Sequence, residues 1–407
     1  MVRATKLNFK KTASDDAVFL WIVDLVIQCF LSILHFMTYA IAWKTDKEVF
    51  LAADSAITTT RKNAGVRLDT EMTAFGRKNF IKDDKTKTVE EKVLKVFLKN
   101  NVGLTCAGYF PLIREVAKAF YEELAKDVSP IEALRWSLGL NPVPKDKDLQ
   151  CAVGFYDEVP KILFFDSQQG SSVYEDIDLV QMGNPPEKFR EMTELWIDTS
   201  PEQIADKPEF QLTRMLGLFQ TYDLLNPPLL ELGIGGVFTG VFIDSSGGHQ
   251  QSDMFFVEYG GDIEKTVSMC VRHDCLVINS PIIGQSRCFL NTFLPNTSEI
   301  IKNQIEKAKQ KGRRLKNKLE YEYILILSHF NKVLFLIEMN REKKHDLIQV
   351  EKFSKGKRSG VIIAYMPTLK NILEDQEAEG LHIAAYKKPS VKKIPDENKK
   401  KRIIKYD

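Results

Sequence analysis

Two apolar runs separated by a short polar break predict a pair of strands early in the chain. The runs are TYAIAW at residues 38–43 and VFLAAD at residues 49–54, and the break is TDKE. This pattern is typical of a tight hairpin. Partners in an antiparallel hairpin lie at equal distances from its turn, so Thr38 is expected opposite Asp54 to within about one residue. A hydroxyl and a carboxylate would then meet at the open end of the hairpin.

A second pair of apolar runs predicts another hairpin. It comprises residues 93–98 and 102–107, and Gly108 ends it. Apolar residues at helical spacing follow at residues 111–125, and a second helix is expected at residues 131–140.

The alternation of strands and helices continues to about residue 260. Between the first and second hairpins, the polar and charged residues 58–90 are expected to form a long excursion from the sheets. The order of strands, two helices, strands, two helices and strands predicts an α+β fold with two sheets between helical layers, a four-layer αββα sandwich. The further strands are expected at residues 150–156, 161–165, 177–182, 236–243 and 254–259, and the further helices at residues 187–197 and 209–225.

The length of the chain, 407 residues, exceeds the roughly 150 residues expected of one domain. We expect a leader of residues 1–37, a main domain of residues 38–285 and a basic C-terminal extension of residues 286–407. The extension is expected to contain a basic helix near residues 302–318, a hairpin at residues 321–339, a strand at residues 360–365 and a charged tail.

The leader contains a strongly apolar stretch, residues 17–36, which follows a basic start. This order is typical of a signal peptide or a single membrane anchor. Asp24 counts against a simple membrane span, because an Asp inside a bilayer helix costs about 2.5 kcal/mol or more. Three interpretations remain open: a removable propeptide, a membrane-targeting segment, or translated sequence ahead of a true start at Met37. In the last case, trimming of the initiator Met would expose Thr38.

Charge and cysteine content narrow the class of protein. The 57 Lys and Arg residues nearly balance the 55 Asp and Glu residues, so nucleic acid is not the expected partner. The basic runs at residues 302–318 and 387–402 are more typical of a solvated helix face and a tail. The six cysteines form no CxxC pair, which indicates neither a zinc site nor a disulfide framework. We therefore expect a cytoplasmic protein without a metal or cofactor.

The opening hairpin resembles the start of a proteasome beta subunit. In that family a processed Thr begins the first strand and an Asp-Ser pair ends the second, as in TYAIAWKTDKEVFLAADSA. The stretch EEKVLKVFLKNNVGLTCAGYFPLIREVAKAFYEEL is similar to the family's next hairpin and first helix. The resemblance to this proteasome-type N-terminal-nucleophile (Ntn) hydrolase family, which includes a related bacterial threonine protease, implies a peptide or protein substrate. It also implies a homo-oligomer, such as a ring.

On this resemblance, Thr38 is the nucleophile, Lys92 is the active-site lysine and Gly108 supplies an oxyanion-hole amide. Lys95 is a rival for the lysine, but Lys92 better preserves the strand and glycine positions. The general base would be the free α-amine of Thr38, whose pKa of about 8 suits proton transfer at neutral pH. The ammonium of Lys92 would favour the neutral amine, and Asp54 would keep that lysine charged and oriented.

The chain departs from the family pattern farther along. Gly183, Asn184 and Pro185 stand where the family has Gly-Ser-Gly. Glu231 offers a carboxylate where the family has an Asp, but Ile234 replaces the Ser ahead of Gly-Gly. Those hydroxyls support the Thr amine and its lysine in the family. Two functions therefore remain open: a threonine-type peptidase or amidohydrolase, and a catalytically degenerate scaffold that binds a partner through its basic extension.

Overall fold

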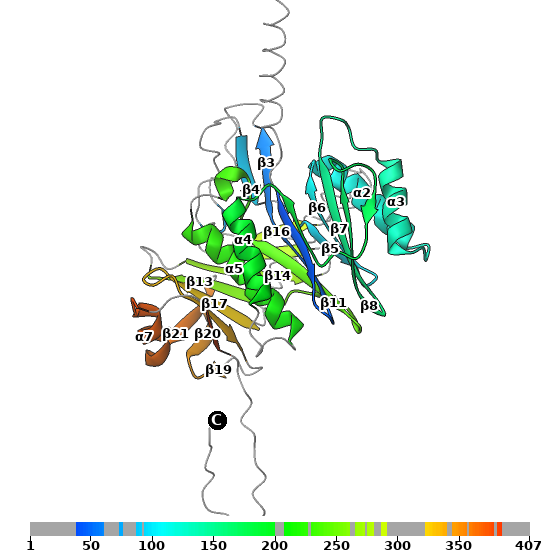
Figure 1. Ribbon diagram of the computed structural model, residues 1–407. Coiled ribbons are helices and arrows are strands. Elements are labelled where there is room, and N and C mark those ends of the chain that lie inside the picture. The colour runs from blue at the N-terminus through cyan, green and yellow to red at the C-terminus, as the bar shows by residue number, and fades with distance from the viewer. Residues whose placement is uncertain are drawn as a thin grey trace, which may run out of the picture.

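A computed structural model shows that the protein has an α+β fold (Figure 1). The structure describes residues 38–60, 73–75, 87–91, 93–199, 207–226, 229–260, 265–272, 275–280, 286–290, 322–339, 344–355, 358–377 and 381–384. The expected leader, Lys92, the basic helix near residues 302–318 and the charged tail lie outside these residues. Among the described residues, none of the helices combines the length and the apolar composition of a membrane span.

The first sheet is antiparallel and begins with the predicted hairpin. Ala40 lies opposite Ala53 in it, and this register, continued by one pair, places Tyr39 opposite Asp54. The expected position of Thr38 near Asp54 is thereby confirmed. In spatial order the sheet comprises β10 (Leu179–Gly183), β1 (Tyr39–Lys44), β2 (Val49–Asp54), β11 (Phe238–Asp244) and β12 (Gly247–Gln250).

The second sheet also has five strands, and each pairs antiparallel with the next along the chain. Its two helices follow the predicted positions closely. The strands are β5 (Val96–Lys99), β6 (Val102–Gly108), β7 (Leu149–Asp157), β8 (Val159–Asp166) and β9 (Val173–Tyr174), and the helices are α2 (Phe110–Leu124) and α3 (Pro130–Leu140).

These two sheets pack face to face. Small and branched residues such as Ala42 and Leu51 of the first sheet share an apolar core with Val96 and Ala152 of the second. A β-carbon on Gly103 would lie 2.2 Å from Cδ1 of Leu51, so a glycine lets the sheets approach closely. Helices α2 and α3 pack on the outer side of the second sheet through a separate core.

The outer side of the first sheet is covered by α4 (Glu187–Asp198) and α5 (Pro208–Leu225). Helix α5 is itself covered on its other side by a third, seven-stranded sheet. Gly217 lies against Leu325 of that sheet, where a β-carbon would come within 2.3 Å of Cδ2. Because sheets enclose α5 on both sides, several of its polar residues are buried and its sequence shows little amphipathic pattern.

The third sheet joins strands from distant parts of the chain. Strand β13 (Met254–Tyr259) pairs antiparallel with β14 (Lys265–Arg272) and parallel with β17 (Tyr323–Ser328). The expected boundary at residue 285 therefore needs correction, because one hydrogen-bonded sheet spans it. The remaining strands are β15 (Cys275–Asn279), β16 (Ser286–Leu290), β18 (Leu334–Glu338) and β22 (Leu381–Ala384).

The predicted C-terminal hairpin is confirmed as β17 and β18, and the strand expected at residues 360–365 lies within β21. A small sheet and a helix pack against the third sheet through another apolar core. They are β19 (Lys344–His345), β20 (Ile348–Lys355), β21 (Arg358–Tyr365) and α7 (Pro367–Glu374). The ends of the predicted polar excursion pair as β3 (Ala56–Thr60) and β4 (Lys87–Glu91).

Candidate active site

A buried lysine links the expected nucleophile to the expected carboxylate. Nζ of Lys95 donates to Oγ1 of Thr38 at 3.2 Å and to Oδ1 of Asp54 at 2.6 Å. Thr38 is 5% exposed, Lys95 3% and Asp54 0%. Hydroxyl, ammonium and carboxylate therefore form one contiguous set away from bulk water.

Backbone amides fix the Asp54 carboxylate in place. The N–H of Tyr39 donates to Oδ1 at 3.2 Å, and the N–H of Gly235 donates to Oδ2 at 2.9 Å. Hydrogen bonds to an ionised acceptor are among the strong ones. Asp54 consequently has a single orientation, and it presents one oxygen to Lys95.

Burial sets the titration of this pair. Loss of hydration lowers the pKa of Lys95 and raises the pKa of Asp54, and the direct contact between the two groups opposes both effects. The amides of Tyr39 and Gly235 further oppose the rise in the pKa of Asp54. The charged form of Lys95 thus depends on Asp54 beside it.

The lysine that contacts Thr38 among the described residues is Lys95. Lys92 lies outside the described residues, whereas Lys95, the rival, makes both contacts. The apolar run that begins at Val93 suggested a strand starting there, but β5 begins at Val96. Val93 instead donates its N–H to the carbonyl of Ser55 at 3.3 Å. The lysine at the start of the strand is therefore Lys95.

Gly108 ends β6 in a conformation that favours glycine. Its φ is +119°, and a β-carbon there would lie 2.2 Å from the carbonyl oxygen of Asp148. The following residue, Tyr109, donates its N–H to that same carbonyl at 2.9 Å. These contacts fix the orientation of the backbone at Gly108, at the end of the strand.

One side chain ties the Thr38 end of the first sheet to the Gly108 end of the second. Gly183, which lies opposite Tyr39, donates its N–H to Oε1 of Gln150 at 2.8 Å. Gln150 lies opposite Ala107, the residue before Gly108. Thr38 and Gly108 consequently lie at the same end of the paired sheets.

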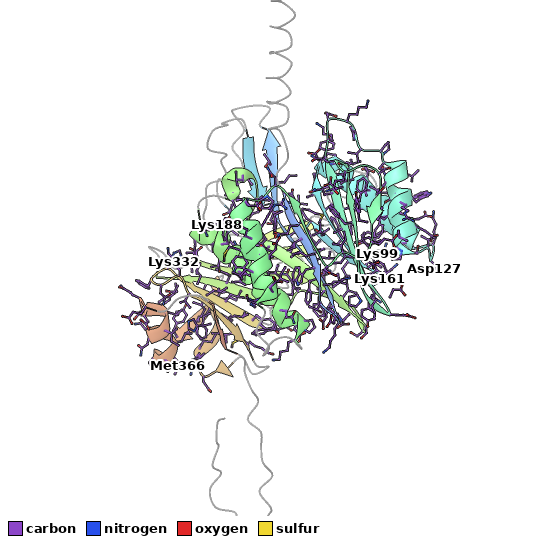
Figure 2. All side chains as sticks on the ribbon, viewed as in Figure 1. Lys99, Asp127, Lys161, Lys188, Lys332 and Met366 are labelled. Carbon is purple, nitrogen blue, oxygen red and sulfur yellow. The ribbon has the colours of Figure 1, made fainter. Side chains whose placement is uncertain are left out.

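The opposite end of the sheets carries surface lysines. Lys99, labelled in Figure 2, lies opposite Val102, which begins the strand that Gly108 ends. Strands β3 and β4 instead project from the end of the sheets where β2 finishes (Figure 1). The candidate site therefore lies where these two strands leave the sheets.

Gly183 abuts the backbone of the expected nucleophile. Its φ is +85°, and a β-carbon would lie only 1.6 Å from the carbonyl oxygen of Thr38. The carbonyl of Gly183 accepts from Nη2 of Arg190 at 2.9 Å, while Gln150 holds its N–H. The peptide groups on both sides of this glycine are thus fixed beside Thr38.

The segment that departs from the family pattern contributes backbone groups. Ile234 is fully buried in the core beneath the first sheet. Glu231 lies in a short 3-10 helix (Leu230–Leu232), and its side chain is outside the described part of the structure.

Gly235 binds Asp54, and the N–H of Val237 donates to Oγ of Ser55 at 3.0 Å. The sequence analysis did not predict that Gly235 binds Asp54, although the Gly-Gly pair was a signal for a close backbone approach.

Together these groups could position a hydroxyl beside a charged lysine and support acyl transfer. The ammonium of Lys95 can stabilise negative charge that develops near Thr38. Because Lys95 contacts Oγ1 of Thr38, that hydroxyl is the candidate nucleophile. No protein-family model matches the chain, and a search of curated proteins also finds no match.

Proposed function

We propose that the protein is a threonine-type hydrolase of the Ntn class, with Thr38 as its amino-terminal nucleophile. The observation that carries the proposal is the bridge of Lys95 between Thr38 and Asp54, at 3.2 Å and 2.6 Å. A lysine buried between a hydroxyl and a carboxylate is an arrangement typical of a functional site. Residues 1–37 must be absent or removed for the α-amine of Thr38 to act.

The layers of the molecule support the same class. Two face-to-face sheets, with α2 and α3 on one side and α4 and α5 on the other, agree with the αββα sandwich of Ntn hydrolases. The third sheet would be an addition outside the α4 and α5 layer. The fold alone does not imply an activity, so the proposal depends on the site.

The proposed reaction is acyl transfer to Thr38 and then to water. The free α-amine of Thr38 accepts the hydroxyl proton while Oγ1 bonds to the substrate carbonyl carbon. The N–H of Gly108 donates to the oxyanion that forms. The carbon–nitrogen bond then breaks, and the leaving amine takes the proton from the α-ammonium group. Water repeats these steps on the ester, which releases the acid and restores Thr38.

The lysine has a supporting role in this scheme. The ammonium of Lys95 lowers the pKa of a nearby α-amine, because it disfavours a second positive charge. More of that amine is then neutral and able to accept a proton. Peptide or protein substrates, assembly into a homo-oligomer and a cytoplasmic location are further parts of the proposal.

A second candidate is a non-catalytic scaffold with the same fold. Ile234 and Asn184 motivate it, because neither offers the hydroxyl found in active family members. Ile234 is also fully buried, so it does not reach the site with a polar group. The scaffold would bind a partner without modifying it.

The deciding experiment combines mass spectrometry with covalent labelling. Mass spectrometry of the purified protein first gives its amino terminus, which we expect to be Thr38. An electrophilic, threonine-directed probe such as an epoxyketone is then expected to label Thr38 in the parent chain, and Thr38→Ala is expected to abolish labelling. Thr199→Ala, which removes an exposed hydroxyl at the end of α4, is the matched control and should be labelled normally.

The alternative outcomes separate the two candidates. A protein that begins at Thr38 but is not labelled supports the scaffold. Labelling that persists in Thr38→Ala would overturn the assignment of the nucleophile.

A further inference from the structure

Residues 73–75, which lie between β3 and β4 in the chain, are buried in the protein interior. Thr73 and Phe75 are each 2% exposed, and Ala74 is fully buried. The N–H of Ala74 donates to Oε2 of Glu91 at 2.8 Å, and its carbonyl accepts from Oγ of Ser280 at 2.6 Å. Both sides of this residue are therefore bound to the protein interior.

An aromatic contact holds the same segment. The ring of Phe75 meets the ring of Phe256 edge to face, with centroids 5.5 Å apart. Phe256 lies on β13 of the third sheet, and Ser280 directly follows β15 of that sheet. Residues 73–75 are thus docked between the third sheet and Glu91 at the end of β4.

Glu91 also supports the loop that holds Asp54. A β-carbon on Gly236 would lie 2.6 Å from Cγ of Glu91 and 2.7 Å from Oγ of Ser55. Gly236 has a φ of +78° and is enclosed between these two side chains. Only glycine fits there, so the position of Glu91 limits where this loop can lie.

The residues on either side of Gly236 make the contacts to the site. Gly235 donates to Asp54, and Val237 donates to Ser55. A shift of Gly236 would therefore redirect the N–H of Gly235. Asp54 would lose part of its orientation, and Lys95 would lose part of its support.

We infer that Glu91 is a positioning residue for the Thr38 site, and that docking of residues 73–75 on Glu91 helps to hold it in place. Glu91 is 4% exposed, and a buried carboxylate needs hydrogen-bond donors such as the N–H of Ala74. Residues 73–75 are then a support of the site. The chemical part of this inference rests on the proposed function, and the structural part does not.

The test uses the full chain, three test variants and one control variant. Glu91→Ala removes the support of Gly236 and the acceptor for Ala74, while Glu91→Gln keeps the size of the side chain. Ser280→Ala removes the hydrogen bond to the carbonyl of Ala74 and leaves Glu91 in place. Glu175→Gln is the control, because Glu175 is an exposed carboxylate paired with Arg135 at 3.4 Å.

Two measurements are made on each variant. The first is the rate of Thr38 labelling by an epoxyketone probe as a function of pH. The second is hydrogen exchange resolved to the amide of Gly235. Far-UV circular dichroism shows which variants are folded.

We expect Glu91→Ala to slow labelling on the order of ten-fold, because a small misplacement of reacting groups has a large effect on rate. The pH midpoint of labelling should rise, because a less firmly held Lys95 lowers the pKa of the α-amine less. Exchange at Gly235 should become faster. Glu91→Gln and Ser280→Ala should change all three quantities in the same direction but less, and Glu175→Gln should match the parent.

Folded Glu91→Ala with the parental labelling rate, pH midpoint and Gly235 exchange would overturn the inference. If Glu91→Ala does not fold, parental values in Ser280→Ala and Glu91→Gln would overturn it equally. If the parent chain is not labelled at Thr38, the proposed function fails by itself. Exchange at Gly235 then still decides whether Glu91 positions the loop.

Discussion

At the scale of single residues, the contact between Lys95 and Asp54 removes two opposite charges from water. A single charge buried at this position would be unstable, because the protein interior does not provide the interactions that the charge makes with water. Two backbone amides complete the binding of Asp54. The pair is thus mutually dependent, and removing one partner should cost more than removing both.

We predict that Lys95→Met lowers the free energy of unfolding by about 3–5 kcal/mol, because it leaves the Asp54 carboxylate buried without a counter-charge. The double variant Asp54→Asn with Lys95→Met should recover part of this loss. Urea unfolding measures both. Lys92→Met is the matched control and should unfold near the parental midpoint. Lys92→Met should retain Thr38 labelling, whereas Lys95→Met should lose it. Equal losses from Lys92→Met and Lys95→Met would contradict the assignment of the lysine.

At the scale of elements, the ends of β1 and β10 are joined by backbone geometry more than by side chains. Gly183 ends β10 with its backbone against the carbonyl of Thr38, and no side chain fits between them. Gln150 from β7 and Arg190 from α4 hold that glycine on opposite sides. Three elements therefore converge on one residue beside the candidate nucleophile.

Two glycine substitutions test this arrangement. Gly183→Ala should destabilise the protein by more than about 1 kcal/mol, because the φ of +85° is unfavourable for alanine and the methyl group would overlap the Thr38 carbonyl. Gly139→Ala, on an open face of α3 with no atom within 4 Å of the added carbon, should stabilise it by about 0.5 kcal/mol. Thermal unfolding of both proteins measures the difference. Similar melting temperatures would show that the contact beside Thr38 is not tight.

At the scale of the whole molecule, the third sheet and the first sheet enclose α5 between them. The parallel pairing of β13 with β17 joins residues on both sides of position 285. Leu325 packs against Gly217 in the middle of α5, and Phe210 meets Tyr323 with ring centroids 5.4 Å apart. Strand β17, which follows position 285, is therefore part of the same folded body as the site.

A chain that ends at residue 285 should consequently fail to unfold cooperatively. Its α5 would expose a large apolar surface, and β13 would lose a hydrogen-bonded neighbour. A chain that ends at residue 385, after β22, keeps every described element and should melt near the parental temperature. Calorimetry and size-exclusion chromatography compare them. A monomeric, cooperatively melting chain of residues 1–285 would contradict this view of the molecule.

Short sequence patterns were enough to predict the local features: the first hairpin, the nearness of Thr38 to Asp54, the glycine that ends β6 and the positions of the main helices. These follow from periodicity and from turns that set the register of neighbouring residues. The contact of Lys95 with Thr38 could not be predicted from such patterns, because apolar Val93 and Leu94 precede the strand without belonging to it. The same holds for Gly235, which lies 181 residues beyond Asp54 in the chain and binds its carboxylate. Contacts between such distant segments depend on how whole layers pack, and no short sequence pattern predicts that packing.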